Sequence, residues 1–185
     1  MGITVATTIS SAMAKRIPSE LAIGGLSGPE RAARQQKLHK EVATIIPPGV
    51  SKTQLRVDIT QKDREDLAVT PLSGSAPLRV GVVKSIPALI GKPFGKAFNQ
   101  GVLKTSKDGL VWAMKIASSG AQSIRIHFTG FSMPDNTEMF FLGQNGQAHG
   151  PYVGNGRNGN GDFWTRSIVS DTGTIVLRYS GNKPD

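Results

Sequence analysis

Residues 109–131 read GLVWAMKIASSGAQSIRIHFTGF, and this stretch decides the fold class. Its second half, from residue 122, alternates apolar and polar side chains with a period of two, which is the pattern of a β-strand that buries one face. A small-residue turn separates it from the first half. We therefore expect Ile124, Ile126 and Phe128 to point into a hydrophobic core.

The first half, residues 109–117, is expected to form another strand. Trp112 shares one face of this strand with Met114 and Ile116. A tryptophan among large apolar residues favours burial, because an indole removes much apolar surface from water. Trp112 is therefore expected to join the core.

Further short stretches of the same character follow, separated by Gly, Pro, Asn and Asp. They are residues 78–86, 137–143, 164–169 and 174–180. The sequence predicts no helix between them, so the crossovers that a parallel sheet needs are missing. We expect a mainly β protein with an antiparallel, jelly-roll-like β-sandwich over residues 78–185.

The preceding part, residues 27–77, is expected to be a helix followed by a linker. Ser27 and Glu30 have the spacing of a capping box at the start of a helix over 27–44. Its apolar face is narrow, so the helix can dock on a surface but cannot organise a core. A short strand is expected near LRVDI, residues 55–59, and a domain boundary near residue 77.

The first 26 residues allow two interpretations. Residues 1–14 read MGITVATTISSAMA, which ends in a small-x-small pattern typical of signal peptidase sites. Either this is a truncated signal peptide, which would indicate a secreted or cell-surface protein, or it is a flexible N-terminus. No apolar run is long enough for a transmembrane helix.

Composition excludes several classes of protein. The 185 residues contain no cysteine, which removes disulfide scaffolds, Cys-ligated zinc, iron–sulfur clusters and thiol nucleophiles. The net charge of +9 is spread along the chain rather than gathered in one basic run. A spread excess is typical of a solvated surface, so specific nucleic-acid binding is not expected, although the charge alone leaves it as a third hypothesis.

No catalytic, metal or cofactor residues are predicted. The chain has neither the G-x-S-x-G of a hydrolase nor the HExxH of a zinc protease. His39, His127 and His149 are far apart in sequence and are expected to be surface or turn residues. Residues 154–159 spell G-x-G-x-x-G, but strand formers follow them, so a dinucleotide site is rejected.

Residues 143–161 contain seven glycines, and aromatic residues lie in and after this glycine-rich segment. A loop this long in a compact domain is usually functional or mobile. Tyr152, Arg157, Phe163 and Trp164 are the candidate binding residues, because aromatic rings beside polar groups can stack on sugars. The alternative is that Trp164, like Trp112, fills the core.

The chain also resembles a known family through a set of motifs in fixed order. They are RVGVVKSIP at 79–87, DGLVWAMKIASSGAQSIRIHFTGFSMPDNTEMFFLGQNG at 108–146 and GPYVGNGRNGNGDFWTRSIVSDTGTIVLRYS at 150–180. This order is similar to the β-sandwich that precedes the protease domain in secreted bacterial trypsin-like serine peptidases, such as lysyl-endopeptidase precursors. Arg166 departs from the family, which usually has an acidic residue there.

The resemblance implies a non-catalytic accessory or pro-domain, part of a longer precursor, whose partner is a peptidase domain in cis or in trans. It would act by protein–protein contact, in folding, latency or substrate positioning. No catalytic residue of the peptidase can be assigned to this chain. The alternative function is a carbohydrate- or cell-wall-binding module with a polysaccharide as partner.

Overall fold

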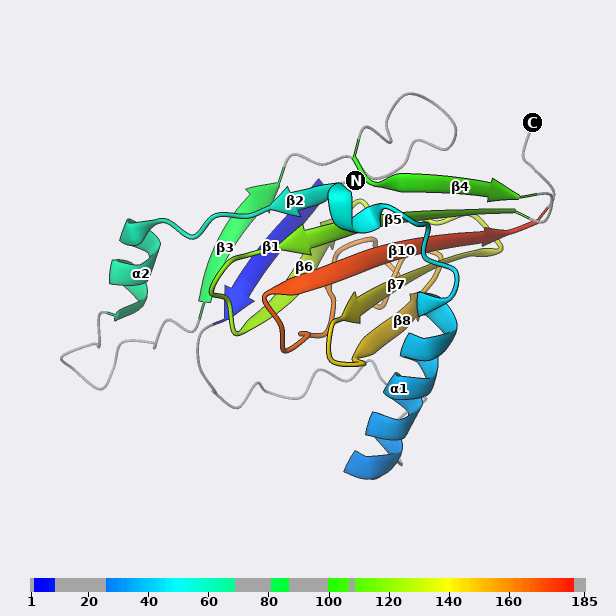
Figure 1. Cartoon of the computed structure of the whole chain (residues 1–185), viewed down its shortest axis with the longest axis horizontal. Coiled ribbons are helices and arrows are strands. Elements are labelled where there is room, and N and C mark those ends of the chain that lie inside the picture. The colour runs from blue at the N-terminus through cyan, green and yellow to red at the C-terminus, as the bar shows by residue number, and fades with distance from the viewer. Residues whose placement is uncertain (1, 9–25, 69–80, 87–99, 107–108, 182–185) are drawn as a thin grey trace.

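A computed structural model describes residues 2–8, 26–68, 81–86, 100–106 and 109–181. The chain is mainly β, as predicted, and its strands form two facing sheets with helices at the margins (Figure 1). The elements, in chain order, are β1 (Gly2–Thr8), α1 (Gly28–Ala43), a 3-10 turn (Val50–Lys52), β2 (Gln54–Arg56), α2 (Gln61–Ala68), β3 (Gly81–Ile86), β4 (Val102–Ser106), β5 (Gly109–Ala117), β6 (Ser123–Thr129), β7 (Thr137–Gly143), β8 (Ala148–Tyr152), β9 (Phe163–Trp164) and β10 (Thr172–Ser180).

The two sheets are linked by strands that alternate between them. One sheet has four strands in the order β3-β1-β6-β9, and the other has six in the order β2-β5-β10-β7-β8, with β4 also paired to β5. From β5 onward the chain crosses to the four-stranded sheet at β6 and at β9, and returns each time. The pairs are antiparallel except β2 with β5, which is parallel. The predicted sandwich is therefore confirmed, with one parallel pair added.

The core lies between the sheets and contains the four residues predicted for it. Trp112 is 2% exposed, and Ile124, Ile126 and Phe128 are fully buried. They pack with side chains from both sheets, including Met139 and Phe141 of β7 and Ile175 and Leu177 of β10. The indole N–H of Trp112 donates to the carbonyl of Gln100 over 3.0 Å, so its one polar atom is satisfied.

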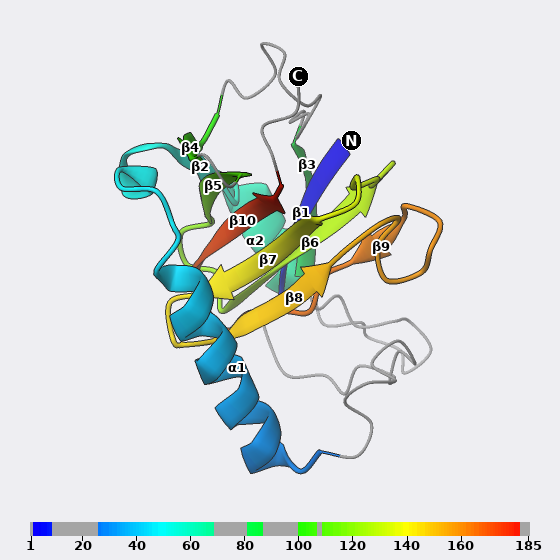
Figure 2. The same ribbon diagram turned by 90° about the vertical axis from the view of Figure 1, so that its right-hand side faces the viewer.

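A second apolar cluster lies on the outer face of the six-stranded sheet. Ala113, Phe140, Leu142 and Val176 contribute to it from the sheet, and α1 covers it (Figure 2). Val42 is the buried residue of α1, and Leu38 packs beside it. The expectation that the helix docks by a narrow apolar face is confirmed, and its Glu30 carboxylate accepts the N–H of Ser27 at 2.7 Å.

Residues 2–8 form a strand that neither sequence interpretation of the N-terminus predicted. These residues form β1, which pairs with β3 on one side and β6 on the other. The segment GITVATT is rich in β-branched residues, and its backbone completes the gap between two strands that do not pair with each other. The Ala12-Met13-Ala14 pattern lies outside the described residues.

The expected boundary near residue 77 also lies outside the described residues. Strands from both sides of it share each sheet: β2 joins the six-stranded sheet and β1 the four-stranded one. Besides β1, two further strands were not predicted. β4 is a weakly apolar edge strand, and β8 has the sequence AHGPY, whose glycine and proline usually interrupt strands. The stretch 164–169 forms a strand only at Phe163–Trp164, followed by a single bridge from Ile168 to Ile124.

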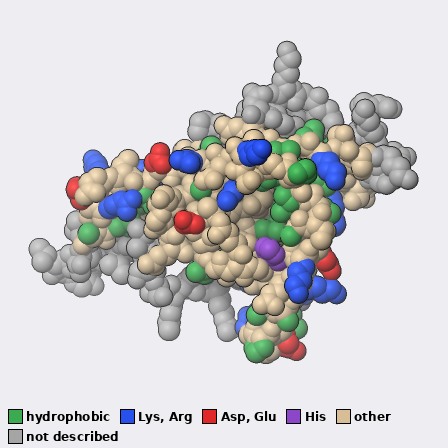
Figure 3. Space-filling view, viewed as in Figure 1, with side chains coloured by type: hydrophobic (Ala, Val, Ile, Leu, Met, Phe, Trp, Pro, Cys, Tyr) green, Lys and Arg blue, Asp and Glu red, His purple; other side chains and the backbone are tan. Residues whose placement is uncertain are grey.

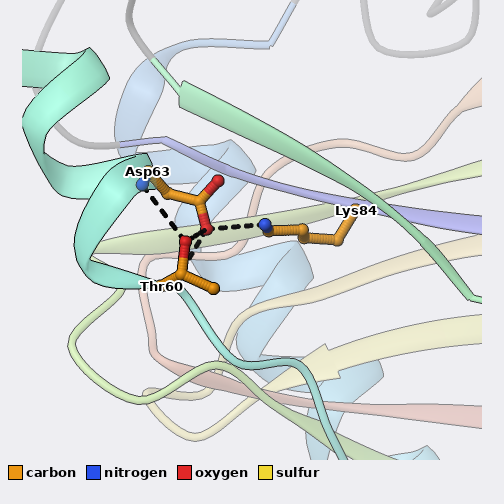
Figure 4. Close-up of polar contacts among 3 residues, drawn as sticks. All are labelled: Thr60, Asp63 and Lys84. Atoms are coloured by element: carbon orange, nitrogen blue, oxygen red, sulfur yellow. Dashed lines mark hydrogen bonds and ion pairs between the residues drawn. The ribbon is translucent and has the colours of Figure 1, made fainter.

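The second helix, α2, is joined to β3 by one carboxylate (Figure 4). Asp63 accepts hydrogen bonds from the backbone and hydroxyl of Thr60 at 2.7 and 2.6 Å, which caps the helix. The same carboxylate lies 2.6 Å from the ammonium of Lys84. Lys84 and Thr60 together lower the pKa of Asp63 to about 2.

Residues 153–162, here called the glycine loop, are hydrogen-bonded into the sandwich. The N–H of Met133 donates to the carbonyl of Gly154, and the N–H of Phe131 donates to the carbonyl of Gly161. Gly156 has a φ of +77°, and a Cβ there would overlap the buried ring of Phe163. The loop is therefore packed against the core rather than projecting from it.

Two alanine substitutions separate backbone strain from overlap in this loop. Gly154 also has a positive φ, of +53°, but a Cβ there meets nothing within 4 Å. We expect Gly154→Ala to cost about 1 kcal/mol of unfolding free energy from the left-handed backbone alone. Gly156→Ala should cost about 3 kcal/mol because it also displaces Phe163. Urea unfolding of both variants measures this, and equal losses would contradict the packed loop.

Candidate functional site

The four predicted binding residues do not form one surface. Tyr152 is 6% exposed and Phe163 is 2% exposed, and both belong to the core between the sheets. Neither can contact a ligand, so their assignment as binding residues is wrong. The period of the sheet explains this, because Phe163 and Trp164 are adjacent and must face opposite sides.

Trp164 lies on the outer face of the four-stranded sheet, where it is half-buried. It is the register partner of His127, and the two rings stack with centroids 4.6 Å apart. The guanidinium of Arg125 lies 4.4 Å from the centroid of the indole. Asp162 completes the group, because its Oδ1 is 2.8 Å from Nε2 of His127. We call Arg125, His127, Asp162 and Trp164 the Trp164 stack.

Arg157, the last predicted residue, lies close to this group. Its guanidinium donates to the carbonyl of Trp164 at 3.4 Å, which ties the glycine loop to β9. Arg157 is half-buried. The structure thus keeps Arg157 and Trp164 together and adds Arg125, His127 and Asp162 to them. The outward orientation of Arg125 and His127 was predictable from the alternation of β6; their meeting with Trp164 depends on the pairing of β6 with β9.

A second polar site lies where α1 meets β8, and the sequence did not predict it. A cavity of about 60 Å³ lies there between α1 and β8. We call it the arginine pocket, and its lining residues are Arg31, Arg34, Gln35, Leu38, Ala148, His149, Gly150 and Arg166. The sequence signal was the spacing of Arg31 and Arg34, three residues apart on one helix face.

His149 forms the buried wall of the arginine pocket. It is 8% exposed, so the prediction of a surface or turn residue is wrong. It belongs to β8, and its Nε2 donates to the carbonyl of Ser167 at 3.2 Å. Burial is the main cause that lowers the pKa of His149 to about 4; the charge of Arg157 acts in the same direction, and the bond to Ser167 opposes both. Burial also lowers the pKa of the Arg166 guanidinium.

A wider groove runs between the end of α1 and the outer face of the six-stranded sheet. Its volume is about 430 Å³, and its lining includes Ile46, Leu142, Lys115 and Thr174. His39 stands at its side, with Nε2 3.0 Å from the carbonyl of Gly143. Figure 3 shows hydrophobic side chains and a histidine in this hollow, above the helix.

Within the described residues no three His, Asp or Glu side chains gather as metal ligands. Of the two helices in the described part of the chain, neither combines the length and hydrophobicity that a membrane span requires. The G-x-G-x-x-G match lies in the glycine loop and leads into β9, whereas a dinucleotide fingerprint leads into a helix.

Comparisons of the chain with protein-family models, curated proteins and solved structures find no match. Function must therefore be inferred from the sites themselves.

The buried histidine makes stability depend on pH. Its folded pKa of about 4 lies below the 6.5 of an exposed histidine, so between these values the unfolded chain binds a proton that the folded chain does not. The free energy of unfolding should fall as pH drops from 6.5 to 4, by about 2–3 kcal/mol from this residue. Urea unfolding across this range measures it.

The control is His149→Gln, which retains a donor for the carbonyl of Ser167 but has no proton to take up. This variant should lose the part of the pH dependence of stability that comes from His149. The contributions of the carboxylates and of the other histidines should remain. A histidine resonance that titrates near pH 6.5 in folded protein, assigned to His149 by this variant, would contradict the prediction.

Proposed function

We propose that the chain is a non-catalytic accessory module of a secreted or cell-surface serine peptidase, acting by protein–protein contact. The observation that carries this proposal is how the motifs of the resemblance meet in space. The N–H of Arg166 donates to the hydroxyl of Tyr152 at 3.4 Å, and the N–H of Ile126 donates to Oγ1 of Thr165 at 2.9 Å.

These bonds connect the Gly-Pro-Tyr motif to the Phe-Trp-Thr motif and to the β6 strand. The motifs thus include residues that hold the two sheets together in one folding unit. A folding unit alone does not specify function. The proposed function therefore also needs a surface that could contact a partner protein.

The exposed face of α1 offers such a surface. Arg31, Arg34, Lys37 and Lys40 recur every three residues and are all exposed. We call them the basic stripe. The stripe lies on a helix that is held by Val42 and Leu38, so it is presented on a fixed support. A cationic stripe favours encounter with an acidic partner surface and makes the association sensitive to salt.

Binding to a peptidase tests this proposal. A secreted bacterial lysyl endopeptidase with a blocked active site is titrated onto the immobilised chain, and the dissociation constant is measured at two salt concentrations. The double variant Lys37→Gln/Lys40→Gln should bind about tenfold more weakly, a loss of about 1.4 kcal/mol. The matched control is Lys62→Gln/Arg64→Gln on α2, which removes the same charge elsewhere. No binding by the unaltered chain, or equal losses in both variants, would reject the proposal.

A second candidate function is a carbohydrate-binding module, and the Trp164 stack favours it. An indole, a guanidinium, an imidazole and a carboxylate lie side by side on the outer face of the four-stranded sheet. Sugars are bound by aromatic stacking combined with such hydrogen-bonding groups. The glycine loop would border the ligand through Arg157.

Tryptophan fluorescence tests the second candidate, because the chain has only two tryptophans. Trp112 is 2% exposed, so a ligand-dependent change must come from Trp164. We expect soluble cell-wall polysaccharides to shift or quench the emission, and Trp164→Phe to abolish the change. If no glycan in a broad panel changes the emission of the unaltered chain, the carbohydrate-binding candidate is rejected.

A further inference from the structure

The arginine pocket brings together cations from distant parts of the sequence. Arg31 and Arg34 come from the first half of α1, and Arg166 comes from the segment after β9. They meet because α1 crosses the edge strand β8, as Figure 2 shows. Like charges repel, so the packing of α1 against the sheet must hold the three guanidiniums around this cavity.

No carboxylate lines this cavity among the described residues. Its eight lining residues include three arginines and no Asp or Glu. Glu30 of α1 is engaged at the helix cap, where it accepts the N–H and hydroxyl of Ser27. Within the described part of the chain, Arg31 and Arg34 have no ion-pair partner. Arg31 and Arg34 therefore give the pocket wall two cations that no described carboxylate pairs with.

The remaining wall adds no negative charge. His149 is neutral at pH 7 and is held by the bond that its Nε2 donates to Ser167, so it adds no charge to the pocket. The guanidinium of Arg166 is partly withdrawn from water. Guanidiniums bind planar or tetrahedral oxyanions by paired N–H donors.

The size of the cavity limits the ligand to a compact group. About 60 Å³ is several times what one water molecule needs, and it is far below the volume of a drug-sized pocket. We propose that the arginine pocket binds a compact oxyanion, a phosphate or sulfate group, either free or at the end of a larger molecule. The site does not rest on the proposed peptidase contact.

Calorimetry with inorganic phosphate and inorganic sulfate tests the site. Sodium chloride at equal ionic strength provides the reference for screening. We expect saturable binding of one oxyanion to the unaltered chain, weakened about tenfold or more by Arg31→Gln/Arg34→Gln. Both arginines are exposed helix residues, so this variant is expected to fold. Circular dichroism checks the fold.

The matched control is Lys37→Gln/Lys40→Gln, which removes the same charge from the same helix outside the pocket. It should change oxyanion affinity by less than about twofold, and equal losses in both double variants would overturn the site in favour of diffuse attraction. The proposed site would also be overturned if the heat of binding of phosphate and sulfate were no larger than that of chloride. Tighter binding of acetate than of phosphate or sulfate would overturn it as well. Methyl phosphate distinguishes the sources: binding equal to phosphate assigns an ester-linked group, and binding of inorganic phosphate alone assigns the free ion.

Discussion

The six-stranded sheet carries apolar side chains on both faces, and the packing of the rest of the structure follows from that constraint. On β5, Trp112 and Met114 face the four-stranded sheet, while Ala113, between them, faces α1. A sheet with two apolar faces needs two covers, because exposed apolar surface costs about 25 cal/mol per Å². The four-stranded sheet covers one face, and α1 with the 3-10 turn covers the other. The helix is therefore part of the fold and not an appendage to it.

Docking of α1 also creates the arginine pocket and the groove beside His39. Val42 fixes the C-terminal half of the helix over the sheet, which leaves the groove beside His39. The N-terminal half then extends past the edge strand β8, where its arginines line the arginine pocket together with Arg166. The basic stripe thus contributes Arg31 and Arg34 to the pocket, while Lys37 and Lys40 lie outside it on the surface. The apolar contact of Val42 and Leu38 holds the helix that carries all four.

The opposite surface of the molecule has a different chemistry. The pairing of β6 with β9 sets His127 beside Trp164 on the outer face of the four-stranded sheet, while Phe128 and Phe163 fill the core behind them. The packed glycine loop supports this pair from the side, since Gly156 admits the ring of Phe163. Protein contact through α1 and ligand contact through the Trp164 stack would use separate surfaces and do not exclude each other.

The amino-acid sequence by itself determined the alternating strands, the inward orientation of Ile124, Ile126 and Phe128, and the capped helix with a narrow apolar face. Each depends on neighbours within a few residues, through the periods of strand and helix. Tertiary structure alone decided the rest. β1 and β8 are strands because partners hold them, although β8 contains Gly150 and Pro151. Tyr152 and Phe163 are buried, and Arg34 lines the same pocket as Arg166, because strand pairing and helix docking bring together residues far apart in the chain. Such contacts depend on which faces of the strands and helices pack together, and the local periodicity of the sequence does not specify that.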